Sequence, residues 1–120
     1  MNTLSIFPKP SPLKEKSLVF DLKSRLDWGK PGLTILDVSD RDLFRRCRIV
    51  GAVSMPKTEL LDLALKSIRF DRDLYVYGDT DTETAEAADV LRAAGYEYVS
   101  ELRGGVAAWK AVGFPVELMY

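Results

Sequence analysis

Short apolar runs alternate with helical patterns along most of this chain of 120 residues. Apolar runs of strand length, bounded by Gly, Pro or polar residues, lie at 33–38, 52–55, 74–77 and 98–102. Apolar residues recur at helical spacing within 17–29, 40–46, 60–68, 82–94 and 104–113. Strands separated by helices predict βαβ units. The fold class predicted is therefore α/β, with a mostly parallel central sheet and helices on both faces.

The N-terminal region is predicted to divide near residue 17. Residues 1–16 contain Pro8, Pro10 and Pro12 among lysines, a composition typical of an extended arm. Ser17 is predicted to cap the first helix, whose apolar stripe is Val19, Leu22 and Leu26. The expected organisation is an arm over 1–16 and one domain over 17–120.

Two other helices can be described in more detail from the pattern. The helix over 60–68 has an apolar face that we expect to consist of Leu60, Leu61, Ala64, Leu65 and Ile68. The helix over 82–94 is rich in alanine and should pack closely against the sheet, and Gly95 should end it.

Composition narrows the classes of function. A formal net charge of −1 argues against a general nucleic-acid surface, and the arginines near 41–48 are interpreted as a solvated helix end. No apolar run approaches the roughly 18 residues that span a bilayer, so no membrane contact is expected. One cysteine cannot form an intrachain disulfide, which fits a reducing, cytoplasmic location. Because histidine is absent, Ser-His and Cys-His catalysis and histidine metal sites are excluded.

The junction between the apolar run 74–77 and the next helix is the strongest candidate for a site. In a parallel sheet such a junction lies at the carboxyl end of a strand, beside the free amides of a helix N-terminus. The loop that forms it is Gly78, Asp79, Thr80, Asp81, Thr82, Glu83 and Thr84. It combines a glycine with three acids, so it has the position of an active site without a nucleophile or a cation.

Three other interpretations of the acids remain open. Thr80 and Glu83 have the spacing of a capping box, and acids in the first turn of a helix are stabilised by its dipole by about 0.3–1 kcal/mol each. The order Asp79-Thr80-Asp81-Thr82 after a strand is similar to the paired aspartates of haloacid-dehalogenase-type phosphotransferases, but Glu83 stands where Thr or Val is expected. A calcium loop lacks its turn glycine and its distal glutamate.

Several segments, in this order and spacing, resemble the rhodanese-like family over roughly residues 17–117. They are Ile35-Leu36-Asp37-Val38, the segment from Phe44 through 49–56, Leu91 to Tyr96, and the segment from Leu102 through Arg103-Gly104-Gly105 to Gly113. The resemblance implies a flavodoxin-sized α/β domain. In active members it also implies a cysteine that carries sulfane sulfur as a persulfide, directly after a strand.

The resemblance also implies that the catalytic cysteine is missing, because Gly78 occupies its position. Asp81 and Glu83 stand where the family often has glycine and arginine, Ser39 stands where an arginine often follows Asp37-Val38, and Cys47-Arg48 replaces a Gly-His pair. A thiolate nucleophile is required for sulfur transfer, and anionic donors need cationic or amide partners. We therefore expect a pseudoenzyme, without cofactor or metal, whose vestigial cleft has Asp37 and Arg48 at its edge.

Two functions follow from these expectations. The first is a catalytically inactive binding or regulatory module, whose acidic loop meets a protein partner with a basic surface. The alternative is a residual sulfurtransferase or sulfur carrier that uses Cys47, whose thiol neighbouring arginines would make more acidic. In the expected fold Cys47 lies in the loop between the short helix and the second strand.

Overall fold

The computed structural model describes residues 13–29 and 31–119, so most of the expected N-terminal arm lies outside the described residues. Its helices are α1 (Val19–Asp27), α2 (Arg41–Arg46), α3 (Leu60–Ser67), α4 (Asp81–Ala93) and α5 (Gly105–Ala111). Its strands are β1 (Lys16–Ser17), β2 (Leu33–Asp37), β3 (Cys47–Ile49), β4 (Val53–Ser54), β5 (Asp73–Tyr77), β6 (Tyr98–Leu102) and β7 (Val116–Leu118).

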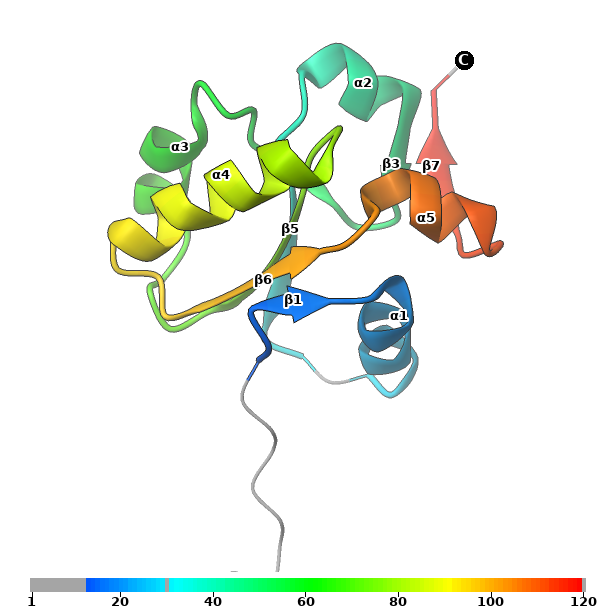
Figure 1. Cartoon of the computed structure of the whole chain (residues 1–120), viewed down its shortest axis with the longest axis horizontal. Helices are drawn as coiled ribbons and strands as arrows, with labels where there is room; N and C mark the ends of the chain where they lie inside the picture. The colour runs from blue at the N-terminus through cyan, green and yellow to red at the C-terminus, as the bar shows by residue number, and fades with distance from the viewer. Residues whose placement is uncertain (1–12, 30, 120) are drawn as a thin grey trace, which may run out of the picture.

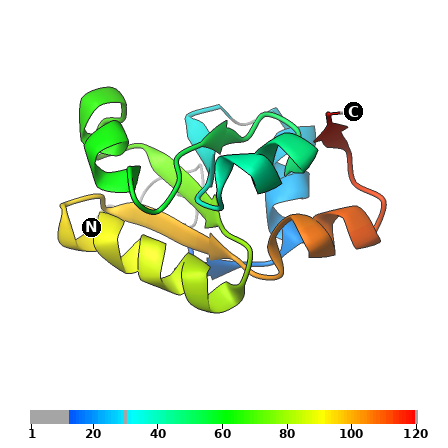
Figure 2. The same ribbon diagram turned by 90° about the horizontal axis from the view of Figure 1, so that it is seen from above.

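The central sheet has five strands in the order β1-β6-β5-β2-β4, and all its pairings are parallel. This arrangement confirms the predicted α/β class. Helices α3 and α4 cover one face of the sheet, and α1 and α5 cover the other (Figures 1 and 2). Alternate residues of β5 supply the two cores, since Leu74 and Val76 pack toward α3 and α4 while Tyr75 and Tyr77 pack toward α1 and α5.

The first helix begins differently from the sequence-based prediction. Ser17 does not cap α1; it is buried in β1, where its hydroxyl hydrogen-bonds the hydroxyl of Ser100 on β6. Pairing with the edge of the sheet satisfies more backbone groups than a cap would, and the N-cap position passes to Leu18. In place of a side-chain cap, Asp21 accepts a hydrogen bond from the backbone N–H of Leu18.

The expected apolar face of α3 is also partly wrong. Leu61 and Leu65 are exposed, whereas Leu60 and Ala64 are buried and Leu63 packs against the core. The helix is rich in leucine on several sides, so the sequence pattern alone could not fix which side faces the sheet.

A second, two-stranded sheet was not predicted. β3 pairs antiparallel with β7 and places Cys47 opposite Leu118, so Cys47 lies in a strand and not in the expected loop. Both strands have three residues, too few for a pattern to reveal them.

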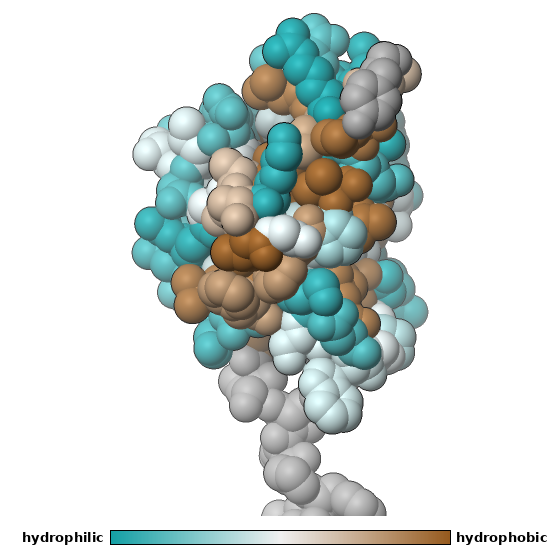
Figure 3. All heavy atoms as spheres, turned by 90° about the vertical axis from the view of Figure 1, so that its right-hand side faces the viewer, coloured by the Kyte–Doolittle hydropathy of each residue, from teal (hydrophilic) through white to brown (hydrophobic). Residues whose placement is uncertain are grey.

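Apolar side chains gather on the side of the molecule that α1, α5 and β7 form (Figure 3). Phe20 of α1 is 57% exposed and stacks edge-on against Phe114, and Val112 and Leu118 are also exposed.

Over residues 13–29 and 31–119, no helix is long and apolar enough to cross a membrane.

Candidate functional site

The candidate loop lies where the connections of the sheet change direction. The chain leaves β2 toward β4 on one side and leaves β5 toward β6 on the other, so the connections diverge between the two neighbouring strands. In open α/β sheets, the crevice at the carboxyl ends of such strands is where ligands bind. Val38 directly follows β2 on one side of this crevice, and Gly78 directly follows β5 on the other. The two connections are joined where the N–H of Val38 donates to the carbonyl of Tyr77 at 2.9 Å.

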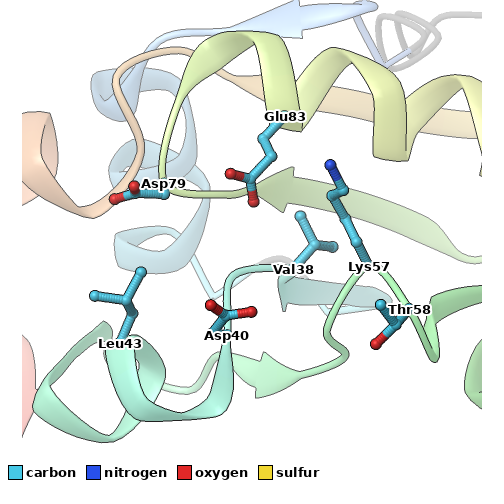
Figure 4. A pocket seen from close by; sticks show the side chains of 7 residues that line it. All are labelled: Val38, Asp40, Leu43, Lys57, Thr58, Asp79 and Glu83. Carbon is cyan, nitrogen blue, oxygen red and sulfur yellow. The ribbon is translucent and has the colours of Figure 1, made fainter.

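A cavity of about 220 Å³ opens at this crevice. Its walls come from three connections: the β2–α2 turn, the segment after β4 and the start of α4 (Figure 4). The lining residues are Val38, Asp40, Leu43, Lys57, Thr58, Asp79 and Glu83. The cavity thus combines three carboxylates, one ammonium group and two apolar side chains.

Threonine side chains hold the loop between β5 and α4 in place. The Gly78 N–H donates to the Thr84 hydroxyl at 2.8 Å, and that hydroxyl donates to the carbonyl of Thr80 at 3.0 Å. The Thr80 hydroxyl accepts from the Glu83 N–H at 3.1 Å, so Thr80 is the N-cap of α4. Amides that could bind an anion at this helix N-terminus are therefore partly used by the protein itself. Thr82 is exposed on the first turn of α4.

Gly78 is buried, and its backbone does not require glycine, because its φ is negative. A Cβ placed there would lie 3.2 Å from Val38 Cγ2, 3.3 Å from Glu83 Cβ and 3.4 Å from Glu83 Oε1. A side chain at position 78 would thus share its space with the Glu83 carboxylate.

The three acids of the loop differ in their partners. Asp81 accepts the N–H of Gly104 at 2.9 Å through Oδ1, and its Oδ2 lies 3.2 Å from the Arg103 guanidinium. Asp81 therefore joins the start of α4 to the start of α5. In the part of the chain that the structure describes, no hydrogen bond or ion pair involves the carboxylates of Asp79 or Glu83.

The remaining charges of the cavity do not neutralise these two acids. Asp40 is exposed, and its carboxylate has no hydrogen-bond or ion-pair partner within 13–29 or 31–119. Lys57 pairs instead with Glu86 on the next turn of α4, at 3.2 Å. The residues that line the cavity therefore include three acids and a single cation, which is already paired; the carboxylates of Asp40 and Glu83 point toward one another, and that of Asp79 lies to one side (Figure 4).

Asp37 lies beneath the crevice and is 1% exposed. Its carboxylate accepts hydrogen bonds from the N–H and the hydroxyl of Ser39, and it faces the hydroxyl of Tyr77. The Tyr77 oxygen also accepts the N–H of Ile49 at 3.1 Å. Burial, and then the charge of Asp37, raise the pKa of Tyr77 well above its ordinary value. Asp37 and Tyr77 are thus a buried support for the crevice and do not line its surface.

Cys47 and Arg48 lie on β3, away from the residues that line the cavity. Arg48 stacks on the ring of Phe44, with its guanidinium carbon 4.7 Å from the ring centroid, and its Nε lies 3.6 Å from Glu117. Cys47 is a free, half-buried cysteine. The structure therefore places these two residues together, but apart from Asp79 and Glu83.

Sequence reasoning missed five residues of the cavity wall, namely Val38, Asp40, Leu43, Lys57 and Thr58. Two signals could have found some of them. Asp40 follows the end of β2, and Lys57 follows the short strand β4, so both lie at the carboxyl ends of parallel strands. In the described residues, no group of three or more His, Cys, Asp or Glu side chains is arranged to hold a metal ion.

Comparisons with known proteins place the chain in a family. The sequence model of the rhodanese-like domain matches residues 19–112. A crystal structure of the Alr3790 protein from Anabaena sp. is 51% identical and superposes with a TM-score of 0.84, covering 86% of this chain and 80% of that one. The probable adenylyltransferase/sulfurtransferase MoeZ of Mycobacterium tuberculosis is 31% identical over 101 residues. A sulfurtransferase of Allochromatium vinosum is 32% identical over 68 residues.

The curated relatives are longer than the region they share with this chain. The match to MoeZ covers 83% of this chain but 26% of MoeZ. The match to the Allochromatium sulfurtransferase covers 57% of this chain and 63% of that protein. The similarity therefore concerns one domain of MoeZ, and the activity of the whole protein does not transfer with it.

Proposed function

The chain belongs to the rhodanese-like domain family, and from that premise we propose that it is a non-catalytic member that binds a basic segment of a protein partner at its crevice. The observation that carries the proposal is that Asp40, Asp79 and Glu83 line one cavity and that their carboxylates have no partners among the described residues. The domain is proposed to extend over residues 17–120.

Loss of sulfur transfer follows from the chemistry of position 78. Gly78 offers no atom that could form a persulfide, and a Cβ at this position would lie 3.4 Å from Oε1 of the Glu83 carboxylate. Two like charges about 5 Å apart repel by roughly 3 kcal/mol at an effective dielectric constant near 20. An anionic sulfur donor would therefore meet repulsion as well as the absence of a nucleophile.

The same cavity suits a cationic side chain. Arginine and lysine carry a charged group on an apolar stem. The carboxylates could receive that charged group, while Val38 and Leu43 could contact the stem. Because charged groups at an interface guide association and select partners, an acidic crevice favours a basic segment over an acidic one.

Cys47 is the alternative centre, as a residual sulfur carrier. Its surroundings support this function less well, because Arg45 pairs with Asp42 at 3.3 Å and Arg48 is engaged by Phe44 and Glu117. Two of the three arginines next to Cys47 in the sequence are thus directed to other partners, which leaves Arg46 to stabilise a thiolate. The binding function is preferred on this ground.

A titration with short peptides tests the proposed binding. Tetra-arginine should bind the wild-type chain in a saturable way, and tetraglutamate should not. The double variant Asp79→Asn/Glu83→Gln should bind tetra-arginine at least about tenfold more weakly, a loss of about 1.4 kcal/mol. Amide chemical shifts in NMR spectra would report both the affinity and the location of binding.

The matched control is Asp27→Asn/Glu97→Gln, which removes the same formal charge at the end of α1 and at the turn before β6. It should leave the affinity within about twofold of wild type. Equal losses in the two double variants would mean that only net charge attracts the peptide, and the proposed crevice would have no special role.

A further inference from the structure

A second cavity, of about 230 Å³, lies at the opposite end of the central sheet. It is lined by Thr34, Ser67, Ile68, Arg69 and Arg72. Thr34 is near the start of β2, and Arg72 directly precedes β5, so this cavity lies at the amino ends of the strands. None of its lining residues takes part in the crevice described above.

Arg72 is held in a fixed position at this cavity. Its Nε donates to the Thr34 hydroxyl at 3.0 Å, and its Nη2 donates to the carbonyl of Leu33 at 2.7 Å. A guanidinium has five N–H donors, and these two bonds leave three of them available. An arginine that is already ordered loses less side-chain entropy when it binds a ligand.

Arg69 supplies a second guanidinium, whose present partner is weak. Its Nε and Nη2 lie 3.2 Å and 3.3 Å from the carboxylate oxygens of Asp71, two residues away. Both side chains are largely exposed, and an ion pair in water contributes about 0–1 kcal/mol. An anion of higher charge can therefore replace Asp71.

The segment that carries both arginines is well ordered by other contacts. The Arg72 N–H donates to the carbonyl of Arg69 at 3.1 Å, and the Phe70 ring lies 4.8 Å from the Tyr96 ring. The C-terminus of α3, whose carbonyls disfavour an anion, is partly satisfied from within the protein. Ser67 donates to the carbonyl of Leu63, and Tyr96 donates to the carbonyl of Ile68.

We propose that this cavity binds a phosphate group. Guanidinium groups match the geometry of phosphate and donate paired hydrogen bonds to it. Two arginines and one carboxylate leave the cavity a positive balance, and a dianion that displaces Asp71 would neutralise both guanidinium charges. A water molecule takes about 30 Å³ in the liquid, so the volume accommodates a phosphate with part of its hydration. The group belongs either to free phosphate or to a phosphorylated side chain.

The test is an NMR titration of the full chain at constant ionic strength, first with inorganic phosphate and then with phosphoserine. Saturable shifts are expected at the amides of residues 67–72. Asp71→Asn should tighten binding about threefold, because it removes the competing carboxylate. Arg72→Gln should weaken binding at least tenfold, and Arg72→Lys, which keeps the charge without the planar fork, should also weaken it.

The control variant is Asp62→Asn, an exposed acid on α3 that pairs with Lys66 and should leave the affinity unchanged. Tighter binding of phosphoserine than of phosphate would identify a phosphorylated side chain as the ligand, and the reverse would identify the free anion. Shifts that do not saturate, or an affinity that Asp71→Asn leaves unchanged, would overturn the proposal. Among residues 13–29 and 31–119, the Asp71 carboxylate has hydrogen bonds and an ion pair with Arg69 alone, so the outcome for Asp71→Asn does not depend on the stability of the arginine variants.

Discussion

The two ends of the central sheet carry opposite charges, although the same strands build both. At the carboxyl ends of β2 and β5, Asp40, Asp79 and Glu83 face a cavity of about 220 Å³. At the amino ends of the same strands, Arg69 and Arg72 line a cavity of about 230 Å³. The fold provides both hollows, and a few side chains determine which charge each would bind. The fold alone therefore does not determine the chemistry of either end.

The largest predicted difference between the two ends is how much their polar groups contribute to the stability of the fold. Asp37→Ala, beneath the acidic crevice, removes the acceptor of two buried groups of Ser39 and of the Tyr77 hydroxyl. We expect the free energy of unfolding to fall by about 2–4 kcal/mol, because buried donors lose their partners. Thr34→Ala, on the same strand, should cost about 0.5 kcal/mol, since its partner Arg72 is exposed. Urea denaturation of both variants would measure the difference. Equal losses of unfolding free energy would show that the fold depends equally on the polar groups at the two ends.

Alkaline pH should destabilise the acidic end through Tyr77. Its folded pKa is raised above the value of 10.0 that applies in the unfolded chain. Below pH 10 the Tyr77 phenol is protonated in both the folded and the unfolded chain, so its contribution to stability is fully present. Above pH 10 the unfolded chain releases a proton that the folded chain retains. The free energy of unfolding should then fall, by up to about 1.4 kcal/mol per pH unit. In Tyr77→Phe this dependence should be shallower; Tyr96, whose pKa burial also raises, would account for the part that remains.

Sulfur-transfer activity at the crevice should require more than one substitution. Gly78→Cys would place its sulfur beside the Glu83 carboxylate, which disfavours a thiolate and repels thiosulfate. The double variant Gly78→Cys/Glu83→Arg should be at least about tenfold more active than Gly78→Cys, a coupling of about 1.4 kcal/mol. Thiocyanate formation from thiosulfate and cyanide would report it, with Glu83→Arg alone as the control. High activity of the single cysteine variant would show that Glu83 matters little.

The smallest predicted effect separates two acids of the same loop. Asp81→Ala should lower the free energy of unfolding by about 1 kcal/mol, because Asp81 joins Gly104 and Arg103 to the start of α4. Asp79→Ala should change it by less than about 0.5 kcal/mol, but should weaken binding of tetra-arginine. Thermal unfolding with the peptide titration would separate the two roles. A reversed order would mean that Asp79 is the structural acid.

The layers of the fold were predictable from the sequence, and much of the crevice wall was not. Strand and helix patterns are local, so β5, α4 and β6 appear at or near their predicted residues. The pairing of Cys47 with Leu118 joins residues far apart in the chain, and no local pattern records it. The sequence also could not show which of Asp79, Asp81 and Glu83 is held by another part of the fold. Only the contact of Asp81 with α5 distinguishes it, and that contact depends on how β6 lies beside β5.

We propose that this rhodanese-like chain transfers no sulfur, either at its crevice or at Cys47. The decisive experiment incubates the wild-type protein with thiosulfate and cyanide and uses mass spectrometry of the intact chain to detect an added sulfur atom. We expect thiocyanate at the level of buffer alone and an unmodified mass. Thiocyanate above that level, accompanied by a persulfide and lost in Cys47→Ser, would contradict it.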